Sequence, residues 1–150
     1  VGNNNLIKAI RLSKFLRDHK QTFSVKSILL TTLIASRVGF LDKFTSGSDF
    51  KDLPTTFKSL FNRLNHWLEG YDSMPVICNP VDEEEDFNRH WDECKFQNFK
   101  SQVCKYNDWI NDAYYEKDKI TSIVKWQKIF GAKFGKSSLV KLRSSSTVYC

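Results

Sequence analysis

The apolar residues of this sequence recur at the spacing of α-helices and nowhere alternate as they do in half-buried strands. The pattern is clearest between Pro54 and Gly70, where the apolar positions are Phe57, Leu60, Phe61, Leu64, Trp67 and Leu68. Such a stripe covers one face of an amphipathic helix, and proline suits the first turn of one. The 150 residues contain only 6 glycines and 3 prolines, too few for the turns of a protein built from many short strands. We therefore predict an all-α fold.

The same period predicts further helices, and we expect about five in a compact bundle. Their apolar faces are Leu6, Ile7, Ile10 and Leu16 in the first, Leu29, Leu30, Leu33 and Ile34 in the second, and Trp91, Phe99, Val103, Tyr106, Ile110 and Ala113 in the longest. We expect Ser24 to cap the second helix and a left-handed Gly39 to end it. Thr121 or Ser122 is the predicted cap of the last helix, which Gly131 stops.

Two segments outside these helices have their own patterns. Met74–Val81 is apolar with proline near both ends, which predicts a buried extended strap rather than a strand of a sheet. The chain after residue 135 is rich in serine, which predicts a frayed tail. We therefore expect a helical domain over residues 1–135 and a Ser-rich tail over residues 136–150.

The charge is divided into three blocks. Residues 1–51 hold nine Lys or Arg against three acids, residues 52–116 six against thirteen, and residues 117–150 eight against one. Two basic ends around an acidic middle differ from the uniform basic coat of a non-specific nucleic-acid binder. The ends could face one polyanion, and the alternative is ordinary solvated charge on helix surfaces.

Several kinds of site are missing from the sequence. There is no P-loop, no Gly-x-Gly-x-x-Gly motif and no apolar run as long as a membrane span, and no signal peptide opens the chain. The spacing of Cys78, His90, Cys94 and Cys104 matches no standard zinc pattern, so we predict no metal site. We expect reduced thiols and a cytoplasmic protein with no membrane partner.

Lys14 and Ser27 form the most specific candidate site. Lys14 projects from the first predicted helix, and Ser27 falls in the first turn of the second. An ammonium group, a hydroxyl group and the free amides of a helix N-terminus are the groups that bind a polyphosphate. The alternative is that Lys14 is solvated and Ser27 only caps its helix.

Four segments support a resemblance to a known family. In chain order they are LIKAIRLSKFLRDH, FSVKSILLTTLIA, MPVICNPVDEEEDF with Trp91, and SIVKWQKIFGAKF. Together they resemble the C-terminal helical half of polymerase-β-like, 2′-5′-oligoadenylate synthetase-like nucleotidyltransferases over roughly residues 5–135. The likeness is greatest to bacterial oligonucleotide cyclases of anti-phage signalling, which are relatives of cyclic GMP-AMP synthase.

The resemblance implies roles for the basic residues of the first two helices. It implies that Lys14 and Ser27 contact a nucleotide triphosphate, with Lys8, Arg11 and Lys26 as weaker helpers. Under this hypothesis the chain is part of an enzyme that makes a cyclic or linear oligonucleotide second messenger from NTPs in antiviral defence. The implied partners are the NTP, an N-terminal catalytic domain, and an activator that is RNA, DNA or protein.

One part of the family pattern is absent. Catalysis in the family is two-metal phosphoryl transfer, with Mg²⁺ held by a Gly-Ser motif and a following Asp-x-Asp strand of the N-terminal half. Here Gly47-Ser48 lies in a polar loop and no Asp-x-Asp strand follows, so we reject it as the catalytic motif. We expect the Mg²⁺ to be held by an N-terminal domain that this sequence lacks. The opening residue, which is Val and not Met, fits that expectation.

Two other hypotheses remain open at this point. The chain could be a non-catalytic helical module that binds nucleic acid or protein through its basic ends. It could also be related to poly(A)-polymerase-like or tRNA nucleotidyltransferases, in which a lysine and a serine have similar roles on a similar helical half.

Overall fold

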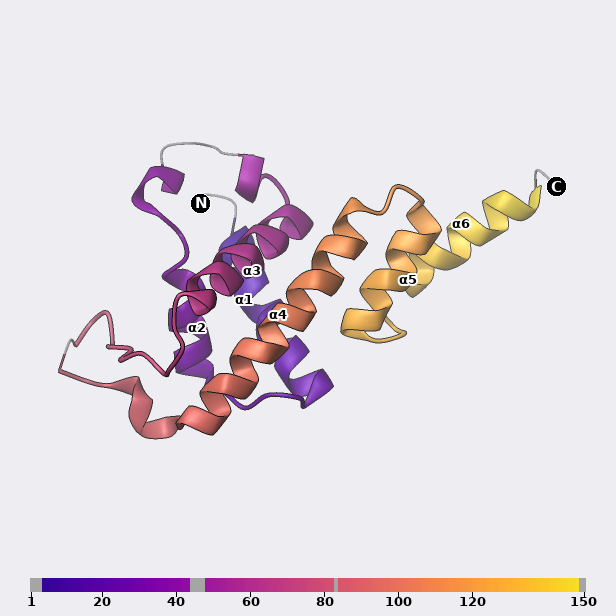
Figure 1. The fold of residues 1–150 in the computed structure, drawn as a ribbon. Helices are drawn as coiled ribbons and strands as arrows, with labels where there is room; N and C mark the ends of the chain where they lie inside the picture. Colours follow the sequence, from indigo (N-terminus) through magenta and orange to yellow (C-terminus); the bar gives the residue numbers. More distant parts are fainter. Residues whose placement is uncertain (1–3, 44–47, 83, 149–150) are drawn as a thin grey trace. The chain divides into compact units, whose positions relative to one another are not determined.

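The computed structural model describes residues 4–43, 48–82 and 84–148 of the chain. Over these ranges the protein is all-α, with six α-helices and three short 3-10 helices and no sheet (Figure 1). The extended pairing that it does contain is an isolated bridge between Cys78 and Asp86. The prediction of an all-α fold is confirmed.

The helices are distributed over two compact units. The α-helices are α1 (Asn5–Lys20), α2 (Ser27–Ala35), α3 (Leu53–Glu69), α4 (Glu93–Tyr115), α5 (Lys119–Phe130) and α6 (Lys136–Val148), and the 3-10 helices are η1 (Phe40–Lys43), η2 (Ser48–Phe50) and η3 (Phe87–His90). One unit is Val1–Asn107 and the other is Asp108–Cys150, so the division falls within α4.

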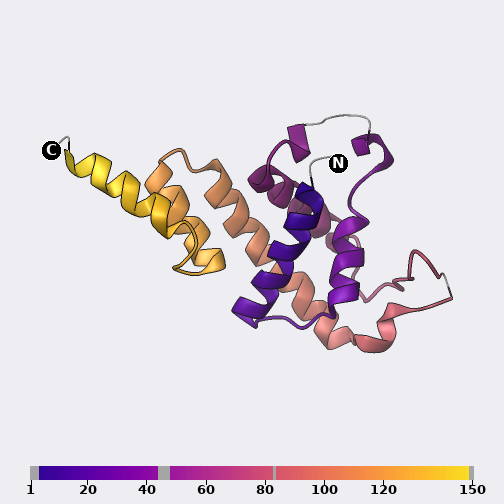
Figure 2. The same ribbon diagram turned by 180° about the vertical axis from the view of Figure 1, so that it is seen from behind.

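In the first unit α1 packs against α2 and α3 (Figure 2). Its buried face consists of Asn5, Ala9, Ser13 and Leu16. The sequence predicts Leu6, Ile7 and Ile10 on this face, and that prediction is wrong: Ile7 is 51% exposed and the other two are only half-buried. Three of the four buried residues are small or polar, so the hydrophobic period alone could not select this face.

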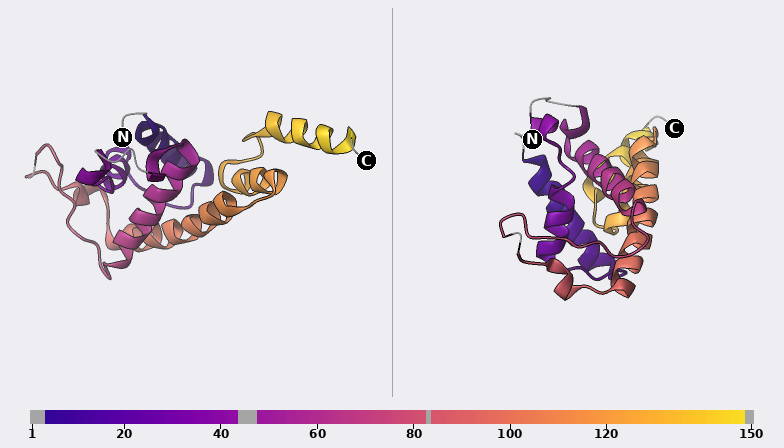
Figure 3. Two further views of the ribbon diagram at one scale, coloured as in Figure 1. Left: turned by 90° about the horizontal axis from the view of Figure 1, so that it is seen from above. Right: turned by 60° about the vertical axis from the view of Figure 1, so that its left-hand side comes forward.

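Helix α3 follows its sequence pattern closely. Asp52 caps it by accepting a hydrogen bond from the Thr55 amide at 2.8 Å, and Pro54 lies in the first turn. The stripe of Phe57, Leu60, Phe61, Leu64 and Leu68 is buried. Helix α3 lies against α1 and α2 (Figure 3). The predicted stop at Gly70 is confirmed.

Three local predictions in the first unit are wrong. The cap of α2 is Lys26, while Ser24 belongs to the extended link before the helix. Gly39 has no positive φ, and α2 ends earlier, at Ala35. The predicted strap of residues 74–81 buries only Ile77 deeply, because it bends into a short pairing with residues 85–87 and leaves Val76 and Val81 exposed.

The second unit contains the end of α4 followed by α5 and α6. Asp118 caps α5 through its carboxylate, which accepts from the Thr121 amide at 2.9 Å, so the predicted cap at Thr121 or Ser122 is wrong. Gly131 ends the helix with φ 96, as predicted. On this helix Phe130 is buried and Trp126 is half-buried. Residues 136–148 form α6 where the sequence predicts a frayed tail, and Leu139 on this helix is buried.

Candidate functional site

The link between α1 and α2 is an extended segment fixed by other parts of the first unit. Three of its backbone carbonyls accept hydrogen bonds from side chains. The carbonyls of Thr22, Ser24 and Val25 accept from Asn98 Nδ2 at 2.8 Å, Trp91 Nε1 at 3.0 Å and Arg17 Nη1 at 2.9 Å respectively. A link outside helices and sheets must satisfy its backbone groups in this way. These bonds therefore determine where α2 begins.

Side chains of the link add packing to these bonds. Phe23 and Val25 are buried, and the Phe23 ring packs edge-on against Phe99 of α4 with centroids 5.5 Å apart. The hydroxyl groups of Thr22 and Tyr106 are hydrogen-bonded at 2.6 Å. Burial of one such apolar side chain is worth about 1.5–3 kcal/mol, so the link is held firmly.

The start of α2 offers free hydrogen-bond donors. Lys26 stands at the cap position in an extended conformation, and no side chain caps the helix. The first intrahelical bond at this end is donated by the Leu30 amide to the Lys26 carbonyl at 2.9 Å. The amides before Leu30 therefore have no acceptor within the helix, and they lie at the positive end of its dipole. Such an end is suited to bind an anion.

Ser27 lies in the first turn of this helix, as the sequence predicts, and is its first residue. Its side chain is exposed, and its Oγ accepts a hydrogen bond from Arg17 Nη1 at 3.0 Å. A hydroxyl group that accepts in this way keeps its own hydrogen for another acceptor. Ser27 can therefore donate to a ligand oxygen while it remains bonded to α1.

Arg17 also contacts this site, although the sequence does not predict it among the candidate residues. Its Nε donates to Asp18 Oδ1 at 2.8 Å, and this bond holds the pKa of the Asp18 carboxyl below its ordinary value. In the sequence a basic residue recurs every three positions along α1 and forms a basic ridge, which consists of Lys8, Arg11, Lys14 and Arg17. The sequence does not show which member of that ridge turns toward α2.

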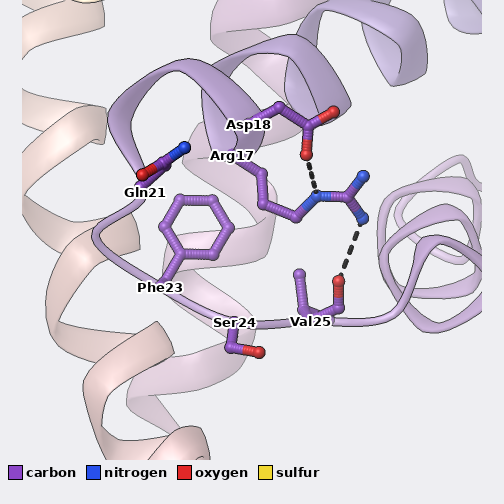
Figure 4. Close-up of a pocket in the computed structure, with 6 residues that line it drawn as sticks. All are labelled: Arg17, Asp18, Gln21, Phe23, Ser24 and Val25. Atoms are coloured by element: carbon purple, nitrogen blue, oxygen red, sulfur yellow. Dashed lines mark hydrogen bonds and ion pairs between the residues drawn. The ribbon is translucent and has the colours of Figure 1, made fainter.

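An open pocket of about 380 Å³ lies beside these contacts (Figure 4). Its lining is Arg17, Asp18, Gln21, Phe23, Ser24 and Val25. In Figure 4 the Arg17 guanidinium lies between the Asp18 carboxylate and the Val25 carbonyl. The pocket is thus a hollow between the end of α1 and the link to α2.

Within the described part of the chain, no hydrogen bond or ion pair joins the side chains of the other predicted residues to Ser27. Lys14 is half-buried one turn before Arg17, and its ammonium group makes no hydrogen bond or ion pair within the described part of the chain. Lys8, Arg11 and Lys26 are exposed, and over the same residues their side chains likewise have no partner. The contact with Ser27 is made by Arg17, and the role of the four basic residues stays a prediction.

Possible metal ligands do not gather at one place in the described part of the chain. Among the residues that the structure describes, no three His, Cys, Asp or Glu side chains gather where they could hold a metal ion. The Gly47 of the rejected Gly47-Ser48 motif and the side chain of His90 lie outside the described set. Cys78, Cys94 and Cys104 are exposed free thiols.

Two solved structures share this architecture. CdnC of E. coli MS115-1 in complex with HORMA-deltaN matches with a TM-score of 0.64, 20% identity and coverage of 89% of this chain. CdnC with ATP matches with a TM-score of 0.68, 22% identity and the same coverage. The chain has the fold of about half of CdnC. It covers 47% and 46% of the two CdnC chains, so it spans less than half of their length.

The match to CdnC agrees with the family resemblance, because CdnC is a bacterial nucleotidyltransferase of the cyclic GMP-AMP synthase-like group. The all-α architecture is consistent with the C-terminal helical domain of CdnC. No family model and no curated protein matches the sequence. In the described ranges, none of the helices has the length and apolar character that spanning a membrane requires.

Proposed function

We propose that this chain is the C-terminal helical part of a nucleotidyltransferase that makes a cyclic or linear oligonucleotide from NTPs in antiviral defence. The observation that carries the proposal is the match to the CdnC structure with ATP over 89% of the chain. The order of the four sequence segments supports the same family independently of the structure. We place the activity in the cytoplasm.

The proposed role of the chain is to bind the triphosphate at the junction of α1 and α2. Lys14 would supply a positive charge, Ser27 a hydroxyl donor, and the first turn of α2 its free amides. Two observations support this role: the Lys14 ammonium has no partner among the described residues, and no side chain caps α2. Lys8, Arg11 and Lys26 would add weaker attraction. In this proposal residues 1–135 form the nucleotide-binding domain.

The described residues do not fit a Mg²⁺ site, because they contain no group of three possible ligands. In the proposal the ion belongs to a catalytic domain outside this sequence, which would supply the carboxylates of two-metal phosphoryl transfer. This chain would contribute binding and orientation of the triphosphate.

A protein activator is part of the same proposal. One of the matched structures holds CdnC together with HORMA-deltaN, which supports a protein partner for this chain as well. Nucleic acid remains the other activator that the basic ends could bind.

The test is the affinity of the 150-residue chain for ATP, measured by calorimetry at several NaCl concentrations. We expect weak binding that falls as salt rises, because charged groups carry it. Lys14→Ala should weaken it about tenfold, since a charge-assisted hydrogen bond is worth about 1.5–3 kcal/mol.

The matched control is Lys141→Ala. Lys141 is an exposed lysine of α6 without a partner in the described part of the second unit. It should leave ATP affinity unchanged. If both variants lose affinity for duplex DNA or RNA to the same degree while ATP does not bind at all, the non-catalytic module is the better account.

A further inference from the structure

Arg17 connects more groups than any other cation described at this junction. Its side chain, only 16% exposed, bonds a carboxylate, a backbone carbonyl and a hydroxyl. The acceptors belong to Asp18 of α1, Val25 of the link and Ser27 of α2. Guanidinium alone among side chains can serve three acceptors in fixed directions.

These bonds constrain the Ser27 hydroxyl. A free serine hydroxyl rotates among its staggered positions, and one that accepts from a fixed donor has fewer positions for its own hydrogen. The same guanidinium nitrogen, Nη1, also holds the Val25 carbonyl two residues earlier. The start of α2 and the Ser27 oxygen are therefore oriented by one group.

The charge of Arg17 is already compensated. Asp18 lies 2.8 Å from Nε and accepts from it, and the pKa of this carboxyl is lowered by that bond, so it stays ionised near neutral pH. An incoming phosphate would meet the Asp18 charge at the same place. Lys14 differs, because no acid is paired with it in the described residues.

We propose that Arg17 is a positioning residue of the triphosphate site: it fixes Ser27 and the first turn of α2 without gripping the phosphate itself. This inference rests on the proposed function. It adds that two neighbouring cations of α1, Lys14 and Arg17, have different roles. Lys14 attracts the phosphate by its charge, and Arg17 orients Ser27 and the first turn of α2.

The experiment measures binding of ATP and of inorganic tripolyphosphate to the full chain and to Arg17→Lys, Arg17→Gln, Ser27→Ala and the double variant of Arg17→Gln with Ser27→Ala. We expect each single variant to weaken binding about tenfold. The losses in the double variant should be less than additive, because both changes remove the same oriented hydroxyl, although only Arg17→Gln also frees the Val25 carbonyl before α2. Arg17→Lys keeps the positive charge and should still lose affinity, since one ammonium group cannot replace the fixed planar donors of the guanidinium.

The salt dependence of the binding affinity distinguishes a residue that positions other groups from one that contacts the phosphate directly. Arg17→Lys, which keeps a positive charge beside Asp18, should keep the salt dependence of the unaltered chain, whereas Lys14→Ala should reduce it. Full affinity in Arg17→Lys, or additive losses in the double variant, would overturn the proposal in favour of a direct charge contact. Unfolding temperatures are recorded for every variant, and Arg17→Lys decides the question if Arg17→Gln does not fold.

The two proposals fail differently. If the unaltered chain binds neither ATP nor tripolyphosphate, the proposed function and this inference both fall. If Lys14→Ala weakens binding and the Arg17 variants do not, the function stands and the positioning role is wrong.

Discussion

Arg63 shows how single residues hold the first unit together. Its guanidinium donates from Nη1 to Asp42 Oδ2 at 2.7 Å and from Nη2 to Asp49 Oδ2 at 3.0 Å, and it also bonds the Arg37 carbonyl at 3.0 Å. Asp42 belongs to η1 and Asp49 to η2, so one residue of α3 holds both short helices. Nothing in the local sequence marks Arg63 for this role.

The Asp42 carboxyl predicts a pH dependence of stability. The hydrogen bond from Arg63 holds its pKa below the ordinary value of 3.8. The folded protein therefore binds fewer protons than the unfolded chain between these two values. The ionised Asp42 carboxylate therefore adds its full contribution to the free energy of unfolding at pH values above the ordinary pKa. This contribution is lost as pH falls through the lowered pKa of the folded protein.

Asp42→Asn should lower the free energy of unfolding by about 1 kcal/mol near neutral pH and flatten its fall in acid. Urea unfolding from pH 2.5 to 7 checks this. Asp72→Asn is the control, because the Asp72 carboxylate makes no hydrogen bond or ion pair with any described residue. Equal curves for Asp42→Asn and the unaltered protein would show that the ion pair does not stabilise the fold.

Helices are the scale at which the sequence is most informative. The α3 stripe and the stop of α5 at Gly131 both follow from local patterns. The caps follow less well, because distant groups decide them. The Ser24 carbonyl is bonded to the indole of Trp91, 67 positions away, and α2 begins only after the link has satisfied its backbone. A local preference for serine at a cap cannot include that partner.

Gly131 carries an element-scale prediction. Its φ 96 and ψ 164 lie in a region that is essentially restricted to glycine. Gly131→Ala should therefore lower the free energy of unfolding by about 1–3 kcal/mol, measured by thermal and urea unfolding.

Gly70→Ala is its matched control. Gly70 also ends a helix, but with φ −74, which alanine adopts readily. A Cβ there would lie 3.3 Å from the Trp67 carbonyl oxygen, so we expect a smaller loss of stability than at Gly131 and not a complete absence of one. If the two substitutions cost the same, the backbone conformation assigned to Gly131 is wrong.

At the scale of the whole chain, the sequence predicts the fold class and the resemblance to a family. It predicts the candidate site only in part. Helical period gives the all-α fold, and the order of four segments agrees with the architecture that CdnC shares. The serine at the first turn of α2 follows from local sequence. Arg17 does not, because its function depends on the link folding back so that Val25 and Ser27 meet α1. Charge counts likewise identify two basic ends without showing which end binds a ligand.

The central claim is that a triphosphate binds where α1 meets α2, and it predicts a specific pattern in a ¹⁵N-labelled sample. Titration with ATP should shift the amide signals of Ser27, Ile28 and Leu29 first, because these groups lie in the uncapped first turn of α2. Lys14→Ala should strongly reduce those shifts at the same ATP concentration below saturation, because it weakens binding about tenfold. Shifts confined to α5 and α6, or none at all, would contradict the account.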